Sequence, residues 1–163
     1  MALKNTDLLE ELFKQRDQWR DRMKNAMSLV KGENLDWEIN RHGKMKWYLH
    51  PAMTDKAIRS LIVFMQEIPP GSRSGKQRHQ GGMVHYILEG KGYTIINGVK
   101  HDWEAGDVVV LPIFPDGLEY QHFNADPENR VLFIAAEPNL FDALGVDMGS
   151  GFEQLENCPD YRG

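Results

Sequence analysis

Histidines are the side chains with the clearest chemical potential in this sequence. Of the six in the chain, His79, His85 and His122 lie within or beside segments expected to be strands. Imidazole nitrogen is the commonest protein ligand for iron, zinc, copper and nickel, and it also takes up and releases protons near neutral pH. These three histidines are therefore candidates for a metal centre or for a general acid–base site.

Strand parity predicts which of these side chains share a face. Residues separated by an even number in an extended strand point to the same side of it. Gln77, His79 and His85 share one parity, provided that no bulge intervenes. Tyr120 and His122 form a second same-face pair on a later strand. Two strands that are distant in sequence are thus expected to direct imidazoles toward a common interior.

Short segments rich in β-branched and aromatic residues must hold these side chains in place. Turn-forming residues separate the segments, and Asn97-Gly98 is the strongest of these signals, typical of a type I′ hairpin. Because no helical pattern interrupts the series, we predict an all-β sandwich or barrel. The expected strands cover residues 45–49, 57–68, 83–88, 93–96, 108–111, 119–123 and 130–136.

A long amphipathic helix is predicted ahead of the strands. Between residues 8 and 30, apolar side chains recur at spacings of three and four, with charged residues between them. Thr6 or Asp7 is placed to cap the amino end of this helix, and Gly32 is placed to end it. We expect the helix to pack on its own domain or on a partner subunit.

Composition and charge argue against several classes of function. The chain has 163 residues, which fits one domain, and its net charge is −5, without the basic excess typical of nucleic-acid binding. No apolar stretch approaches the roughly 20 residues that span a bilayer, and the first residues do not resemble a signal peptide. We therefore expect a cytoplasmic protein that binds neither nucleic acid nor membrane. The single cysteine, Cys158, is expected to be a free thiol.

Two segments, 71–90 and 106–124, resemble the two sequence motifs of the cupin superfamily. The resemblance implies a double-stranded β-helix, or jelly-roll, barrel over residues 57–138. A helix and a lead-in strand would then occupy residues 1–56, and a C-terminal tail residues 139–163. The framework residues that match the motifs are Gly71, Gly90, Gly106, Pro112 and Asn124.

Within the superfamily, the motifs are similar to those of gentisate 1,2-dioxygenase and related ring-cleaving enzymes, in which histidines hold iron. His79 keeps a ligand position of the cupin pattern. His85 and His122 each lie two residues beyond a ligand position that has been replaced, which allows a shifted set of ligands. The replaced positions hold Gln77, Met83 and Tyr120, where the motifs place histidine, glutamate and histidine.

The first hypothesis from this pattern is a metal-dependent enzyme of the non-haem dioxygenase type. A divalent metal, with Fe(II) favoured and Mn, Ni or Zn as alternatives, would be held by His79, His122, His85 and Gln77. Tyr120 and His85 are the expected catalytic residues. The resemblance suggests a small hydroxylated aromatic compound, or a similar chelating oxygenated compound, as substrate.

The second hypothesis is a cupin without a metal, which binds a small molecule or performs acid–base chemistry of the isomerase type with His79, His85, Tyr120 and His122. A third reading is a structural role, with the N-terminal helix as the contact surface. In each case we expect a homodimer, because a jelly roll with exposed sheet edges favours pairing with a second copy.

Overall fold

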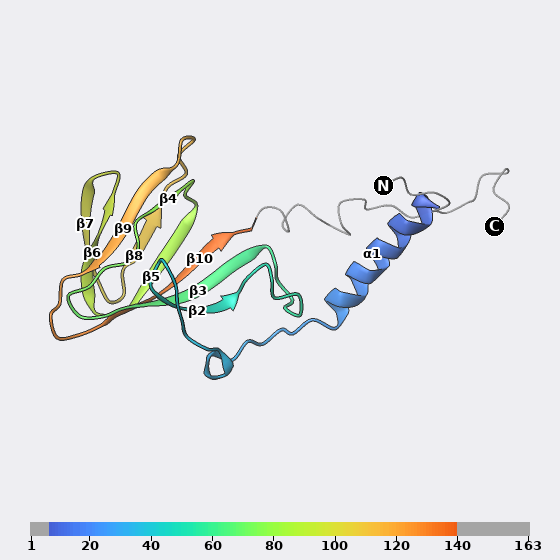
Figure 1. Ribbon diagram of the computed structural model, residues 1–163, viewed down its shortest axis with the longest axis horizontal. Helices are drawn as coiled ribbons and strands as arrows, with labels where there is room; N and C mark the ends of the chain where they lie inside the picture. Colours follow the sequence, from blue (N-terminus) through green and yellow to red (C-terminus); the bar gives the residue numbers. More distant parts are fainter. Residues whose placement is uncertain (1–6, 140–163) are drawn as a thin grey trace.

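The computed structural model describes residues 7–139, which form one helix, a short 3-10 helix and two β-sheets (Figure 1). The expected tail, including Cys158, lies outside the described residues except for Asn139. In chain order the elements are α1 (Leu8–Lys24), η1 (Gly32–Asn34), β1 (Glu38–Ile39), β2 (Lys44–Leu49), β3 (Leu61–Ile68), β4 (Gln77–His79), β5 (Met83–Glu89), β6 (Lys91–Ile96), β7 (Val99–Glu104), β8 (Val108–Leu111), β9 (Leu118–Asn124) and β10 (Val131–Pro138).

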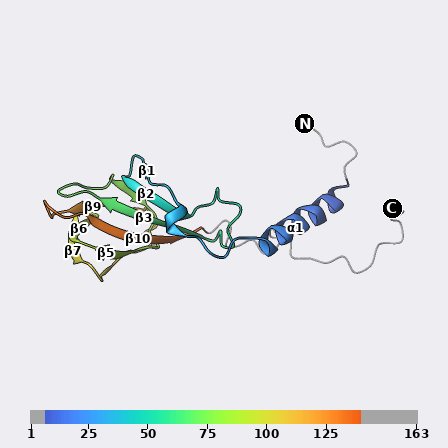
Figure 2. The same cartoon turned by 90° about the horizontal axis from the view of Figure 1, so that it is seen from below.

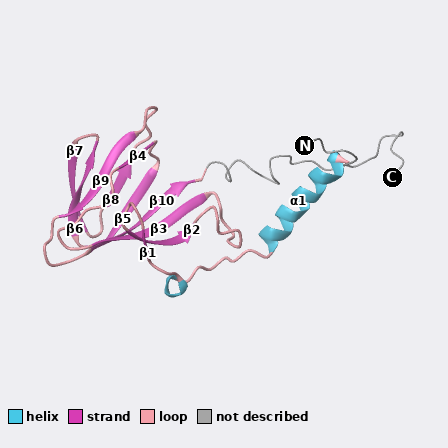
Figure 3. Cartoon of the chain, in the orientation of Figure 1, coloured by secondary structure: helices cyan, strands magenta, loops and turns pink. Residues whose placement is uncertain are grey.

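The strands build two separate antiparallel sheets that lie face to face (Figure 3). The larger sheet has the order β1-β2-β3-β10-β5-β8, and the smaller has the order β4-β9-β6-β7. The sheets are not closed into a barrel, so the expected barrel is corrected to an open sandwich. One physical reason is the segment 112–117 between β8 and β9, where Pro112 and Pro115 have no backbone N–H to donate to a neighbouring strand.

The hairpin between β6 and β7 confirms the turn predicted at Asn97-Gly98. Asn97 has a φ of 47° and Gly98 a φ of 84°, as a type I′ turn requires, and Ile96 pairs with Val99 across it. Strand β7 is the partner strand that this hairpin implies, although its sequence is polar and Trp103 is its one buried residue.

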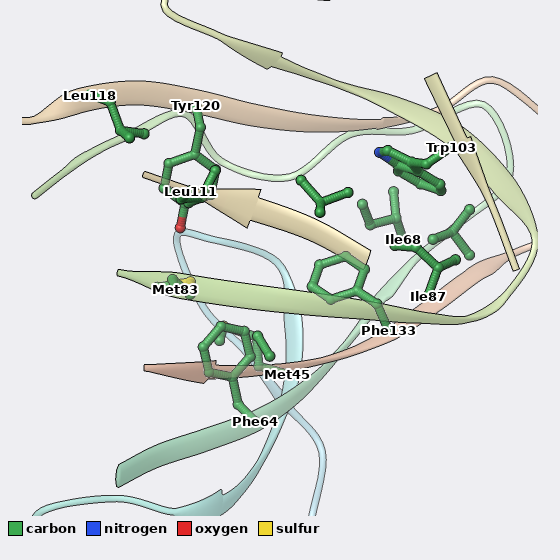
Figure 4. Close-up of a cluster of buried hydrophobic side chains, with 13 residues drawn as sticks. Met45, Phe64, Ile68, Met83, Ile87, Trp103, Leu111, Leu118, Tyr120 and Phe133 are labelled. Atoms are coloured by element: carbon green, nitrogen blue, oxygen red, sulfur yellow. The ribbon is translucent and has the colours of Figure 1, made fainter. Parts of the chain in front are cut away.

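The core lies between the two sheets and consists of the inward-facing residues of most strands (Figure 4). Alternate residues of β5 and β9 are buried, which is the period of a strand with one face on a core. Tyr120 projects from β9 into this interior (Figure 4). The fully buried apolar side chains include Ile87, Leu111, Leu118, Val131 and Phe133.

Helix α1 begins where the sequence predicts but ends earlier. The Asp7 side chain accepts hydrogen bonds from the backbone N–H groups of Leu9 and Glu10, as a cap should. The helix ends at Lys24 instead of residue 30, because the Asn25 side chain bonds back to the carbonyl of Asp21 and the chain beyond it pairs with residues 55–57.

The helix projects beyond the sandwich (Figure 2), and no residue of it is buried. Leu9, Leu12 and Met23 of its apolar stripe are exposed, whereas the Trp19 ring lies against Arg59. No helix within residues 7–139 is long and apolar enough to cross a membrane.

Candidate functional site

An open cavity of about 520 Å³ lies between the sheets, among β2, β3, β4, β5, β9 and β10. One part of its wall is apolar, formed by Met45, Trp47, Phe64 and Met83. Polar side chains line the remainder of the cavity, so it can bind a small organic molecule by its carbon skeleton and orient it by hydrogen bonds. These polar residues are Asn40, Arg41, His42, Gln77, His79, Tyr120 and Glu137.

His79 is held in this cavity by contacts at both ring nitrogens. Its Nε2 lies 2.7 Å from Oε2 of Glu137, and its Nδ1 accepts a hydrogen bond of 2.9 Å from the backbone N–H of Gly81. An Nδ1 that accepts places the ring proton of the neutral imidazole on Nε2, facing the carboxylate. Gly81 is required there, because its φ is +92° and a Cβ would collide with the carbonyl oxygen of Pro112.

Gln77 and Tyr120 form a second polar pair in the cavity. They are directly opposite each other in the ladder between β4 and β9, and the tyrosine hydroxyl donates a hydrogen bond of 2.6 Å to Oε1 of Gln77. Burial and, second, the negative charge of Glu137 raise the pKa of Tyr120 above its ordinary value. The hydroxyl therefore stays protonated at neutral pH.

His85 and His122 lie deeper, with no exposed surface. Their ring centroids are 4.5 Å apart, and both rings pack on Phe133. Nδ1 of His122 is 2.7 Å from Oγ1 of Thr94, which also accepts a hydrogen bond of 2.8 Å from Nε1 of Trp103. Strand β9 thus directs Tyr120 and His122 to the same interior side, as parity predicts.

Burial keeps these deeper histidines neutral. It lowers the pKa of His85 to about 3 and that of His122 well below its ordinary value. Repulsion between the protonated forms of neighbouring rings lowers both pKa values further, from His42 at His85 and from His85 and then His42 at His122. Within the described residues, both ring nitrogens of His85 and Nε2 of His122 have no well-aligned hydrogen-bond partner. Buried polar atoms without a partner lower the stability of the fold.

The shared parity of His79 and His85 does not hold. The segment 80–82 interrupts the strand, so His79 belongs to β4 of the smaller sheet and His85 to β5 of the larger one. The positive φ values of Gly81 and Gly82 show the break directly.

A histidine and a carboxylate of the cavity, His42 and Glu137, were not among the predicted site residues. His42 is 7% exposed, and burial lowers its pKa to about 4. The turn that positions it is visible in the sequence, since Asn40 Oδ1 accepts from the N–H groups of His42 and Gly43. Glu137 shares the parity of buried Phe133 in β10, and that signal could have found it.

The donor atoms around His79 do not fit the iron centre that the sequence pattern suggests. Gln77 and Tyr120 satisfy each other, and both nitrogens of His79 are engaged. His85 and His122 pack together behind the Tyr120 ring instead of joining His79. Among residues 7–139, no group of three or more His, Cys, Asp and Glu side chains is arranged to hold a metal ion.

Comparison with known proteins identifies the class of fold. Residues 64–136 match the family model of the cupin domain. The fold is shared with a cupin 2 conserved barrel domain protein from Salinispora arenicola, at a TM-score of 0.56 and 18% identity over 73% of this chain and 95% of that one. It is also shared with the polyketide cyclase RemF of Streptomyces resistomycificus, at a TM-score of 0.57 and 15% identity over 69% and 79% of the chains. Residues 64–136 are therefore a cupin domain.

Two curated proteins resemble the chain in sequence. A 5-aminosalicylate 1,2-dioxygenase from Comamonas is 26% identical over 99 residues, which are 61% of this chain and 25% of that protein. The dimethylsulfoniopropionate lyase DddW from Ruegeria pomeroyi is 27% identical over 89 residues, 50% of this chain and 59% of that protein. The chain thus spans a quarter of the first relative and little more than half of the second.

Proposed function

We propose that the protein is an enzyme that binds a small enolisable, oxygenated compound in the cavity and moves a proton with Glu137 as general base. The observation that carries this proposal is the contact of 2.7 Å between His79 and the Glu137 carboxylate inside a cavity lined by apolar side chains. A carboxylate fixed beside a bound carbon acid can remove a proton without any further group.

The two oxygens of Glu137 have different tasks in this proposal. Oε2 accepts the hydrogen bond from His79 Nε2, which fixes the direction of the carboxylate. Oε1 takes the proton from the substrate carbon. Because the Glu137 side chain is only 16% exposed, little bulk water competes for this oxygen. His79 therefore acts as a positioning residue and Glu137 as the catalytic residue.

Tyr120 supplies the complementary hydrogen-bond donor. Its raised pKa keeps the hydroxyl protonated, so it can donate to the oxygen on which negative charge develops when the substrate is deprotonated. The hydroxyl now donates to Gln77, and a substrate oxygen takes the place of that amide acceptor. Trp47 and Phe64 contact the carbon skeleton, and Arg41 at the exposed rim attracts a substrate carboxylate.

The lyase among the relatives supports proton transfer as the reaction type, because an elimination requires a base that removes a proton from carbon. A test uses deuterium incorporation into a panel of 2-oxo acids, 3-oxo acids and hydroxylated aromatic acids, followed by proton NMR in D₂O. We expect the wild type to exchange at least one compound and Glu137→Gln to lose the exchange. Glu128→Gln, at an exposed turn, is the matched control. Equal exchange by Glu137→Gln and the wild type would exclude Glu137 as the base.

A second candidate is the Fe(II)-dependent dioxygenase acting on a hydroxylated aromatic compound. The observation that favours it is the similarity to 5-aminosalicylate 1,2-dioxygenase. Its test is substrate-dependent oxygen uptake by protein purified anaerobically and reconstituted with Fe(II). Uptake that is lost on chelation would favour this candidate over metal-independent proton transfer.

We also propose that the protein is a homodimer. Four exposed apolar side chains form two cross-strand pairs on the outer face of β5 and β8, and no charged side chain lies among them. A second copy with the same net charge of −5 therefore meets no like charge there. The pairs are Val84 with Val110 and Tyr86 with Val108.

A further inference from the structure

The hydrogen bond between Gln77 and Tyr120 connects two neighbouring strands of the smaller sheet, β4 and β9, in the lining of the cavity. We propose that this pair occupies a latent metal site, which the present side chains keep closed to transition metals and which two substitutions to histidine would open. The inference does not depend on the proposed proton transfer, because its readout is metal binding.

The register of β4 and β9 brings three side-chain positions together. Gln77 is the direct partner of Tyr120, and directly opposed residues in an antiparallel pair have Cβ atoms about 4.5–5.5 Å apart. His79 is two residues from Gln77 on the same strand, so the two lie roughly 6.8 Å apart along one face. All three side chains line the same cavity.

The present donor atoms disfavour a metal ion at this point. The Tyr120 hydroxyl is buried and donates its hydrogen bond to Gln77, whereas a phenol must lose its proton to bind a metal well. The Gln77 oxygen already accepts this hydrogen bond. His79 directs its Nε2 proton at Glu137. A metal ion at this point would therefore have to break both the Tyr120–Gln77 hydrogen bond and the His79–Glu137 contact, and it would gain one imidazole.

Histidine at positions 77 and 120 changes this balance. The two new imidazoles have no phenol–amide hydrogen bond to break, and together with His79 they offer three nitrogen ligands. The Glu137 carboxylate lies 2.7 Å from His79 Nε2 and is placed to add an oxygen ligand or to hold a ligand histidine. Three imidazoles with one carboxylate form a donor set that suits divalent first-row metals.

The experiment compares Co(II) binding, followed by visible absorption and equilibrium dialysis, in the wild type, Gln77→His, Tyr120→His and the double variant. We expect the double variant to bind one Co(II) per chain about 100-fold more tightly than the wild type, and to lose this binding when His79→Ala is added. The matched control is the double variant Arg78→His with Gln121→His, which adds two imidazoles to the same strands at the alternate positions that face away from the cavity.

Circular dichroism establishes that each variant is folded before the titration. If the Tyr120 substitution unfolds the chain, Gln77→His alone carries the test, with an expected increase in affinity of about tenfold over the wild type. Stoichiometric, His79-dependent Co(II) binding by the wild type would overturn the inference. A folded double variant that binds no more tightly than the wild type or the control would also overturn it.

Discussion

The imidazole of His79 and the carboxylate of Glu137 meet across the cavity, with 2.7 Å between Nε2 and Oε2. This contact joins β4 of the smaller sheet to β10 of the larger one. A histidine and a carboxylate that are 58 positions apart in the chain are thus held together by the sandwich itself. The contact fixes one oxygen of Glu137 and is the basis of the proposed proton transfer.

Substitution of His79 tests its role as a positioning residue. His79→Leu removes the N–H that fixes Glu137, and we expect kcat to fall about 10–100-fold with little change in KM. His79→Gln keeps an N–H donor of similar reach and should recover part of the rate. Steady-state kinetics on the compound identified by deuterium exchange gives kcat and KM for both variants. Equal losses in the two variants would show that the hydrogen bond is not what matters.

Acid sensitivity should follow from the buried histidines. Their pKa values in the folded protein are lowered, to about 4 for His42 and about 3 for His85, below the usual value of about 6.5 that applies to the unfolded chain. At pH values between the folded and the unfolded pKa of each histidine, the unfolded state binds more protons than the folded state. The stability present above about pH 6.5 is therefore lost as the pH falls. Each histidine lowers the unfolding free energy by up to about 1.4 kcal/mol for each pH unit in this range.

Urea unfolding at several pH values between 7 and 4.5 measures this slope. His85→Leu, which cannot take up a proton, should show a shallower decrease of the unfolding free energy with falling pH than the wild type. The exposed His101 provides the control, because His101→Leu should leave the slope unchanged. Identical slopes for all three proteins would contradict the burial argument.

The hydroxyl of Thr94 should be essential to the deeper polar network. It contacts Nδ1 of His122 and accepts from Nε1 of Trp103, and Thr94 itself is fully buried. Thr94→Val keeps the shape but leaves two buried polar groups without a partner, so we expect a loss of about 1–3 kcal/mol in unfolding free energy. Thr94→Ser retains the hydroxyl and should lose less. Chemical denaturation followed by Trp fluorescence gives both values.

The proposed homodimer is tested at its uncharged sheet face. Light scattering at micromolar concentration should give twice the chain mass of 18.7 kDa for the wild type. Val110→Lys places a charge at the centre of that face and should produce a monomer, whereas Lys100→Glu on the exposed β7 should not. A monomeric wild type would refute the proposed dimer.

Local patterns predicted much of the fold. Three of these predictions each depend on a few neighbouring residues, and the structure confirms them: the hairpin at Asn97-Gly98, the cap at Asp7, and the shared inward face of Tyr120 and His122. The strand pattern left sandwich and barrel open, and the closed barrel that the family resemblance implied was wrong, because closure depends on which strand edges meet and no local pattern encodes that. The end of α1 was missed because pairing with residues 55–57 competes with helical continuation.

The candidate site was only partly visible for the same reason. His79 was selected by its motif position, but its partner Glu137 comes from the last strand, and only the sandwich brings the two together. His42 reaches the cavity through a turn that lies before the motifs. Sequence spacing treated His79 and His85 as neighbours, whereas the break at residues 80–82 sends them to different sheets.

The most direct test of the proposed function uses one sample of wild-type protein that is purified anaerobically. Its metal content is measured by plasma mass spectrometry before a chelator is added, and its deuterium exchange is measured before and after. We predict far less than one metal ion per chain before chelation, and a rate of exchange that the chelator leaves unchanged and Glu137→Gln abolishes. Near-stoichiometric iron before chelation, with exchange lost on its removal and restored by Fe(II), would contradict metal-independent proton transfer at Glu137.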